Sequence, residues 1–135
     1  MQTRVATCAC GQLRATCEGE PQRVGVCSCI QCQKRSGSAF SVNSFFECEQ
    51  VKVEGEAKRF TRGSDAGRTL DFSFCLECGS TVYWTNDARP DLIMVAVGAF
   101  GDPSFPAPMR SVWAKHKHHW VALPEGLPEY PGHPQ

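Results

Sequence analysis

The sequence has no excess of charge of either sign, because its 14 Lys and Arg residues are balanced by 14 Asp and Glu residues. A surface without net charge gives no electrostatic reason to expect nucleic acid or an anionic membrane as a partner. The longest apolar stretch, residues 92–100, is about half as long as a membrane-spanning helix must be. We therefore expect no nucleic-acid partner and no association with a membrane.

The sequence also lacks a recognisable secretory signal, because residues 1–8 contain no apolar segment of the required kind. We therefore expect a cytoplasmic protein. It has no internal repeat, low-complexity tract or linker, and 135 residues are the size of one domain. Hydrophobic residues make up 41% of the chain and charged residues 21%, which excludes a disordered protein. We expect a single domain over residues 1–135.

Cysteine is unusually abundant, with nine residues in the chain. This abundance is typical of secreted disulfide-linked domains and of metal-binding domains. The odd number would leave a free thiol if the others formed disulfides, and seven of the nine lie in clusters with one or two intervening residues. Such spacing favours convergence on an ion over pairing with distant cysteines. We therefore expect a metalloprotein.

Most of the hydrophobic pattern has a period of two residues, interrupted by Gly and Pro, which predicts short β-strands. The predicted strands are residues 13–18, 51–54, 70–75, 81–85 and 92–100. The last of them is apolar enough to be buried on both faces. One short helix is predicted at residues 30–36 and ends at Gly37, whereas the proline-rich tail after Gly101 is expected to be irregular. The expected fold is mainly β, with several short antiparallel sheets and one short helix.

Two of the cysteine clusters together provide four thiol ligands. Cys75 and Cys78 are separated by two residues, which form a tight turn that brings the sulfurs to the separation of about 3.8 Å required on tetrahedral zinc. Cys8 and Cys10 point to the same side of an extended chain, and a kink at the following glycine, Gly11, would bring them close enough. We expect these four cysteines to hold a structural zinc ion in a closed site.

The remaining cluster provides three thiols, Cys27, Cys29 and Cys32, within six residues. The segment passes from an extended strand into the predicted helix, whose N-terminal dipole would help to keep the thiols ionised. Three protein ligands and one open position are typical of a catalytic zinc site. We expect the open position to accept water, a thiolate or a carbonyl oxygen.

A fourth protein ligand would instead close this second site. The remaining candidate groups are Cys17, Cys48, His116, His118 and His119. We expect Cys17 to pack in the core, because it lies on the apolar face of its strand. Neighbouring carboxylates should disfavour the thiolate of Cys48, and the three histidines lie in a solvated run with two lysines. Cys75 or Cys78 could also complete the triplet, which would leave the first pair without partners.

The three cysteine motifs occur in a specific order along the chain. They are Cys8-x-Cys10-Gly11, Cys27-x-Cys29-x-x-Cys32 and Phe74-Cys75-x-x-Cys78-Gly79-Ser80. In this combination they resemble the glutathione-dependent formaldehyde-activating enzyme family, which includes centromere protein V. The similarity continues through Lys34-Arg35-Ser36-Gly37-Ser38 and reaches Trp120 and Leu127-Pro128, so that it covers nearly the whole chain. Ser111 stands where members of the family often carry a histidine.

The resemblance implies a β-tent, which is a fold of several coiled β-sheets, with two bound zinc ions. It implies the same division of the cysteines into a structural group of four and a catalytic group of three. It also implies a carbon–sulfur lyase that reversibly joins glutathione and formaldehyde into S-(hydroxymethyl)glutathione. On zinc, an incoming thiol would lose its proton, or the aldehyde oxygen would be polarised. We therefore expect glutathione or another small thiol as the substrate.

Glutathione has two carboxylates, so its site should offer basic side chains. The candidates are Lys34, Arg35, Arg62 and Arg68, of which the first two follow the triplet and the others flank residues 63–67. Three tryptophans could line the pocket, although core packing is the expected role of each. They are Trp84, Trp113 and Trp120.

The alternative function is a non-catalytic module in which both zinc ions are structural and a surface binds another protein. The sequence leaves the oligomeric state open. Metal content and the separate effects of losing each cysteine group distinguish the two functions.

Overall fold

Ten strands form two sheets in the computed structural model, which describes residues 2–64 and 66–134. The smaller sheet has the order β1-β2-β5, and the larger has the order β10-β3-β4-β9-β8-β7-β6. The smaller sheet contains β1 (Thr3–Thr7), β2 (Arg14–Glu18) and β5 (Val51–Glu54). The larger contains β3 (Arg23–Cys27), β4 (Ser41–Glu47), β6 (Ala57–Gly63), β7 (Thr69–Cys75), β8 (Thr81–Asn86), β9 (Leu92–Ala96) and β10 (Arg110–Val112).

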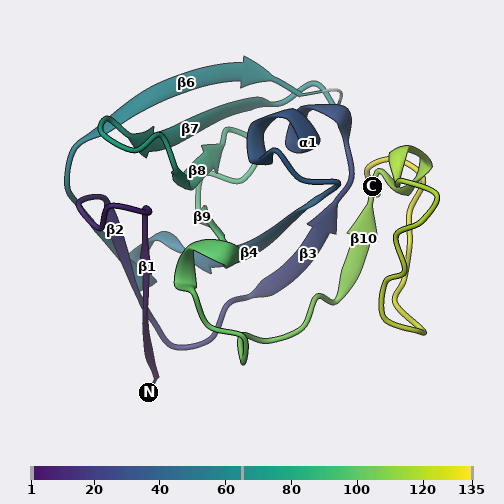
Figure 1. Cartoon of the computed structure of the whole chain (residues 1–135), viewed down its shortest axis with the longest axis horizontal. Coiled ribbons are helices and arrows are strands. Elements are labelled where there is room, and N and C mark those ends of the chain that lie inside the picture. Colours follow the sequence, from purple (N-terminus) through teal and green to yellow (C-terminus); the bar gives the residue numbers. More distant parts are fainter. Residues whose placement is uncertain (1, 65, 135) are drawn as a thin grey trace.

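The larger sheet curls strongly, from β6 and β7 along the top of the view in Figure 1 to β3 and β10 at the right. The one α-helix, α1 (Ile30–Ser36), lies close to β6 and β7, with which it shares a surface hollow. Three 3₁₀ helices complete the described structure, namely η1 (Cys48–Gln50), η2 (Val97–Phe100) and η3 (Ala114–His116). None of the described helices is both long and apolar enough to span a membrane.

The predicted fold class is confirmed, because the described residues are mainly β, with mostly antiparallel strand pairing and a single α-helix. The helix also has the predicted bounds. Its N-cap is Cys29, whose sulfur accepts a hydrogen bond from the backbone N–H of Cys32, and it ends at Gly37 with φ of 69°. Only a residue that tolerates the left-handed region closes a helix in this way at low cost, which favours glycine there.

The strand predicted for residues 92–100 is too long. β9 ends at Ala96, and the chain then turns through η2, which is closed by Gly101 with φ of 59°. Gly98 weakens a continued strand, and the turn places Phe100 against Phe46 and Phe105, with ring centres 6.3 and 4.6 Å apart. The apolar sequence pattern therefore extends beyond β9, because the residues of η2 are also apolar and pack against aromatic side chains.

The tail after Gly101 is less irregular than predicted. β10 adds to the edge of the larger sheet, parallel to β3, and residues 128–132 then fold back along it. The backbone N–H of Trp113 donates to the carbonyl of Gly132 over 3.1 Å. Trp120 is 65% exposed, so the expectation that it packs in the core is wrong, whereas Trp84 is 4% exposed and buried as expected.

The main core lies where the two sheets face each other. Its fully buried members include Leu13 and Cys17 from the first residues of the chain and Phe46 from β4. The core position predicted for Cys17 is therefore confirmed. Alternate residues of β4 face opposite ways, so that Phe45 instead packs with Phe72 and the other inner residues of the curled sheet.

Candidate metal centres and the adjoining cavity

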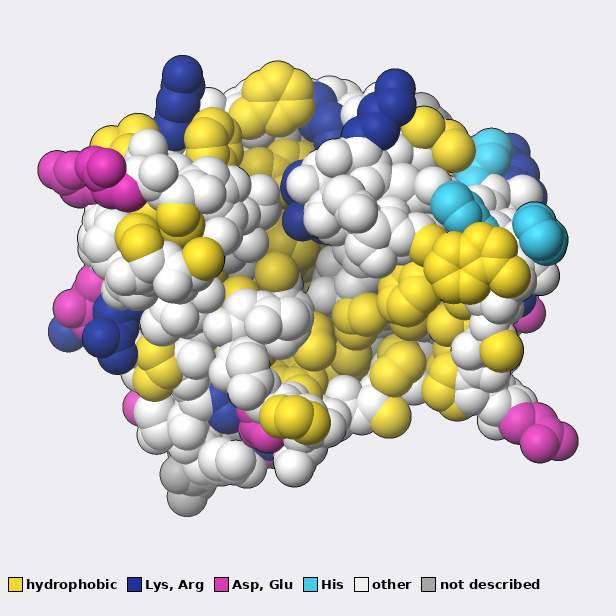
Figure 2. Space-filling model, viewed as in Figure 1, with side chains coloured by type: hydrophobic (Ala, Val, Ile, Leu, Met, Phe, Trp, Pro, Cys, Tyr) yellow, Lys and Arg dark blue, Asp and Glu magenta, His cyan; other side chains and the backbone are white. Residues whose placement is uncertain are grey.

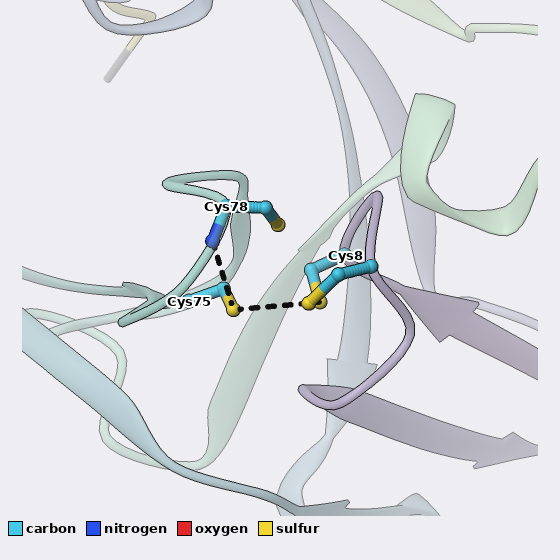
Figure 3. A group of neighbouring side chains, drawn as sticks. Cys8, Cys75 and Cys78 are labelled. Carbon is cyan, nitrogen blue, oxygen red and sulfur yellow. Dashed lines mark hydrogen bonds between the residues drawn. The ribbon is translucent and has the colours of Figure 1, made fainter.

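The two turns that the sequence predicts for the four-cysteine group meet in space. Their residues are Cys8, Cys10, Cys75 and Cys78, and all four sulfurs lie within 4.8 Å of one another. Figure 3 shows Cys8 from the β1–β2 turn facing Cys75 and Cys78 from the β7–β8 turn. The sulfur of Cys10 lies 3.6 Å from the sulfurs of Cys8 and Cys75. Tetrahedral zinc–thiolate bonds of about 2.3 Å require a spacing close to this.

Local backbone geometry brings each pair together. Gly11 has φ of 86° and its N–H donates to the carbonyl of Cys8, which is the kink that the Cys8–Cys10 spacing requires. Gly79 has φ of 78° and its N–H donates to the carbonyl of Cys75. A side chain at either position would strain the turn, because left-handed backbone is costly for residues with a Cβ.

Hydrogen bonds to sulfur prepare the group for ionised thiols. The backbone N–H of Leu13 donates to the sulfur of Cys8 over 3.3 Å, and that of Glu77 donates to Cys75 over 3.3 Å. The hydroxyl and backbone of Ser80 lower the pKa of Cys78 to about 5. Donors aimed at sulfur stabilise the thiolate, which is the form that binds metal.

The neighbouring thiols work against complete ionisation without a cation. Although the backbone of Gln12 lowers it, hydrogen bonds with Cys8 and Cys75 raise the pKa of Cys10 to about 12. Four thiolates at this spacing would repel one another, and a divalent cation would remove that repulsion. The donor set, its geometry and its charge therefore fit zinc.

Gln12 supports this group and was not predicted from the sequence. Its side-chain amide donates to the sulfur of Cys75 over 3.0 Å and to the carbonyl of Glu56 over 2.6 Å, and it accepts from the Glu56 N–H. Although burial raises it, this amide and nearby backbone N–H groups lower the pKa of Cys75. The contact depends on the pairing of β2 with β5, which no local pattern near Gln12 predicts.

The three-cysteine group lies at the junction of β3 and α1. Cys27 ends β3, Cys29 caps α1 and Cys32 lies in the first turn of the helix, so that their sulfurs are within 4.8 Å of one another. The three side chains are 9%, 9% and 7% exposed, respectively. Among the described residues, no further His, Cys, Asp or Glu completes this group.

The three thiols of the triplet hydrogen-bond to one another, so the ionisation of each depends on the protonation of the others. Hydrogen bonds with Cys27 and Cys29 lower the pKa of Cys32 to about 2, and hydrogen bonds with Cys29 and Cys32 raise the pKa of Cys27. One sulfur is thus readily ionised at the expense of the others. A soft divalent cation with room for a fourth ligand would allow all three to ionise, so the triplet fits a zinc ion with one open position.

Among the described residues, none of the other candidate ligands joins the triplet. Cys17 is buried in the main core, and Cys48 is exposed, with its sulfur 3.6 Å from the carbonyl of Pro90. His118 hydrogen-bonds to the side chain of Gln33, and His116 stacks on Trp113. The alternative in which Cys75 or Cys78 joins the triplet does not match the structure, which places both with the first pair.

The triplet opens onto a cavity of about 510 Å³. A separate view of the surface, Figure 2, shows a hollow near the centre of the face drawn, with apolar side chains inside it and Lys and Arg side chains above it. Trp113 packs against the cysteines at one end of the cavity, and Phe72 and Trp84 line its apolar wall. Such a cavity can hold a small organic molecule next to the triplet.

Residues 3–116 match the family described as the glutathione-dependent formaldehyde-activating enzyme. The chain belongs to this family. A crystal structure of a Rhodobacter sphaeroides protein also matches, with a TM-score of 0.57 and 16% identity over 93% of this chain and 98% of that chain. At this identity the likeness shows the fold alone. A comparison with curated proteins found no match.

In this member of the glutathione-dependent formaldehyde-activating enzyme family, the four predicted basic residues fall in two places. Arg62 and Arg68 line the cavity that contains the triplet. Lys34 and Arg35 line an adjoining hollow of about 360 Å³, to which Arg62 also contributes. The guanidinium of Arg35 lies 4.5 Å from the centre of the Trp84 ring, so it stacks on the wall of the cavity.

Two further cavity arginines, Arg23 and Arg110, were not predicted. Arg23 could have been found from the sequence, because it is four residues before Cys27 on the same face of a strand. Arg110 could not, because its position depends on the pairing of β10 with β3. Ser111, which stands where relatives often carry a histidine, is fully buried and lies on the opposite face of β10 from Arg110.

Proposed function

We propose that this family member is a zinc-dependent enzyme of the carbon–sulfur lyase type, which reversibly joins a glutathione-like thiol to formaldehyde. Cys27, Cys29 and Cys32 would hold the catalytic zinc ion, and the group of four cysteines a structural one. The observation that carries the proposal is that one cysteine group has four sulfurs and the other has three. Four thiols form one group at the junction of the two sheets, whereas three thiols face a cavity of about 510 Å³.

Zinc in the three-cysteine site would supply a vacant position at which an incoming thiol loses its proton. The sulfur of that thiol attacks the carbonyl carbon of formaldehyde. The carbon–sulfur bond forms as the carbonyl double bond opens onto oxygen, and the proton given up by the thiol ends on this oxygen. Nothing is oxidised or reduced, and the reverse reaction releases the thiol and formaldehyde.

The protein's own side chains would bind and orient the thiol. Trp113 limits access of water to the cysteines, and Phe72 and Trp84 provide an apolar wall. We assign Arg62 and Arg68 to carboxylate binding, since both line this cavity. Arg35 instead supports the wall through its stacking on Trp84, and Lys34 is exposed on α1. Holding the thiol still next to a small aldehyde lowers the entropic part of the barrier.

We further propose a cytoplasmic location, because thiolate ligands bind metal only while they stay reduced. None of the nine cysteines forms a disulfide in the structure.

Serine substitutions in each group test this proposal. We expect Cys29→Ser to stay folded with about one zinc ion per chain instead of two, and to form the hydroxymethyl adduct no faster than the uncatalysed reaction. Cys78→Ser should unfold the domain or make its folding depend on added zinc. Cys48→Ser, which removes an exposed thiol outside both groups, is the control. Equal damage to folding from Cys29→Ser and Cys78→Ser would favour the zinc-stabilised protein-binding module.

A further inference from the structure

The cavity floor is built on one face of β3. Arg23, Gly25 and Cys27 alternate along this strand and therefore share a face. Since a strand rises about 3.3 Å per residue, Gly25 lies about 7 Å and Arg23 about 13 Å from Cys27 along the floor. This face of β3 therefore has Cys27 of the triplet at one end and the guanidinium-bearing Arg23 at the other.

A second guanidinium crosses the middle of this row. Arg110 of β10 lies directly opposite Gly25, and a Cβ at that glycine would be 3.8 Å from the Arg110 Cγ. This distance is an ordinary van der Waals contact, so the Arg110 side chain lies directly beside the Gly25 position on β3. Burial and the charges of Arg23 and Arg68 lower the pKa of Arg110, which places the three arginines within electrostatic reach of one another.

The third guanidinium comes from the opposite wall. Arg68 precedes β7, and its Nη1 donates to Nε2 of His133 over 2.9 Å. A histidine nitrogen that accepts a hydrogen bond from arginine carries no proton. His133 is therefore neutral, and it neither adds to the positive charge of Arg68 nor offsets it. Arg68 thus lines the cavity, and no carboxylate of the part of the chain that the structure describes neutralises it.

The cavity has more positive than negative charge. Within residues 2–64 and 66–134, no carboxylate lies within ion-pair distance of Arg23, Arg68 or Arg110. Of the two carboxylates that line the cavity, Asp91 is paired with Arg89 at 2.9 Å, and the other is Glu47. Three clustered arginines without a carboxylate partner among the described residues favour an anion between them.

At the level of Gly25, across β3 from Arg110, lies a polar atom that has no partner among the described residues. Asn43 of β4 faces Gly25 on the side opposite Arg110, and its Oδ1 is buried without a hydrogen bond to any described residue. A buried acceptor of this kind is costly unless a donor reaches it. The amide N–H of a ligand that extends along the floor would supply that donor.

We propose that the cavity binds a peptide-like thiol whose carboxylate is held by Arg23, Arg68 and Arg110 and whose amide N–H donates to Asn43. This inference rests on the proposed function, because the thiol end would lie at the cysteine triplet. A ligand that fits must carry a thiol, an amide N–H and a carboxylate at the spacing of the triplet, Asn43 and the arginines. Free cysteine and cysteamine are too short to reach from the triplet to the arginines or lack the carboxylate, whereas glutathione has sulfur, amide and terminal carboxylate in this order.

Calorimetric titration of the zinc-loaded protein with S-methylglutathione tests the inference without using the thiol. We expect this ligand to bind, and its diethyl ester to bind about 10- to 100-fold more weakly, because esterification removes charge-assisted hydrogen bonds. Arg110→Gln and Arg23→Gln should each weaken binding of the acid about tenfold or more. Arg14→Gln, which changes an exposed arginine on β2 away from the cavity, should leave the affinity unchanged.

The possible outcomes separate this inference from the proposed function. If Arg110→Gln and Arg23→Gln bind S-methylglutathione as Arg14→Gln does, or the diester binds as tightly as the acid, the anion site is wrong. Failure of S-methylglutathione to bind the wild type at millimolar concentration also overturns it. If glutathione binds no more tightly than its S-methyl form while Arg110→Gln weakens both, the anion site stands and thiol binding at zinc fails. The acid-to-ester comparison needs no variant, so it holds even if a substitution impairs folding.

Discussion

His133 accepts a hydrogen bond from Arg68 over 2.9 Å, although 65 residues separate the two in the chain. The other ring nitrogen, Nδ1, donates to the carbonyl of Pro134 over 2.7 Å. These two contacts fix the neutral ring in one tautomer, because arginine can only donate and a carbonyl can only accept. The bond fastens the C-terminal segment to the chain just before β7 and closes one side of the cavity.

This contact predicts a dependence of stability on pH. Burial and the charges of Arg68, Arg110 and Arg23 lower the pKa of His133 from its usual 6.5. A group with a lowered pKa in the folded state contributes stability that is present above the unfolded value and lost as pH falls through the folded value. Wild type should therefore lose more thermal stability than His133→Gln between about pH 7.5 and 5.5. His119→Gln, which removes an exposed histidine, should behave as wild type, and an equal loss in all three proteins would contradict the assignment.

A second prediction concerns the stacking of Arg35 on Trp84. The guanidinium lies 4.5 Å from the Trp84 ring centre and 5.2 Å from that of Phe72, and its Nε and Nη2 are buried without a described hydrogen-bond partner. Planar stacking of this kind is not reproduced by lysine. We expect Arg35→Lys and Arg35→Gln to lower the free energy of unfolding by about 1 kcal/mol in urea titrations. Lys34→Gln, on the exposed side of the same helix, is the control, and equal stability of all variants would show that the stacking contributes nothing.

The sequence predicts the cysteine pairs within each turn because their geometry is local, whereas the meeting of two such pairs depends on the tertiary fold. Cys29 and Cys32 are brought together by a single helical turn, and Cys75 and Cys78 by one tight turn, so that spacing alone indicates each pair. Arg110 could not be predicted, since a parallel strand pairing brings it to the cavity over a long sequence separation. The end of β9 was missed for a different reason, because aromatic packing in η2 preserves an apolar pattern that looks like a strand.

Gly55 provides a test of how the four-cysteine group is supported. It has φ of 100°, and a Cβ there would lie 2.0 Å from the carbonyl oxygen of Gln12, the residue whose side chain donates to Cys75. Gly126 also has a positive φ, of 82°, but a Cβ there would meet nothing within 4 Å. The comparison therefore separates the cost of left-handed backbone from that of the close contact.

We expect Gly126→Ala to cost about 1 kcal/mol of unfolding free energy and Gly55→Ala more than about 3 kcal/mol. Gly55→Ala should also speed the loss of zinc from the four-cysteine group, because it displaces Gln12. Gln12→Ala should reproduce the faster zinc loss with a smaller loss of stability. Equal effects of the two glycine substitutions would show that the contact with Gln12 relaxes without cost.

Removal of zinc by a chelator should proceed in two steps. An ion in the three-cysteine site would have one protein ligand fewer and would face the cavity, so we expect it to leave first, with the fold retained in far-ultraviolet circular dichroism. Although Cys10 and Cys78 are exposed, an ion in the four-cysteine site would join the β1–β2 and β7–β8 turns, and its loss should unfold the domain. Trp113 packs against the triplet, so its fluorescence should change in the first step, and Trp113→Phe should lack that change. Loss of both ions together with the fold, in one step, would contradict the division of the cysteines into an open site and a closed one.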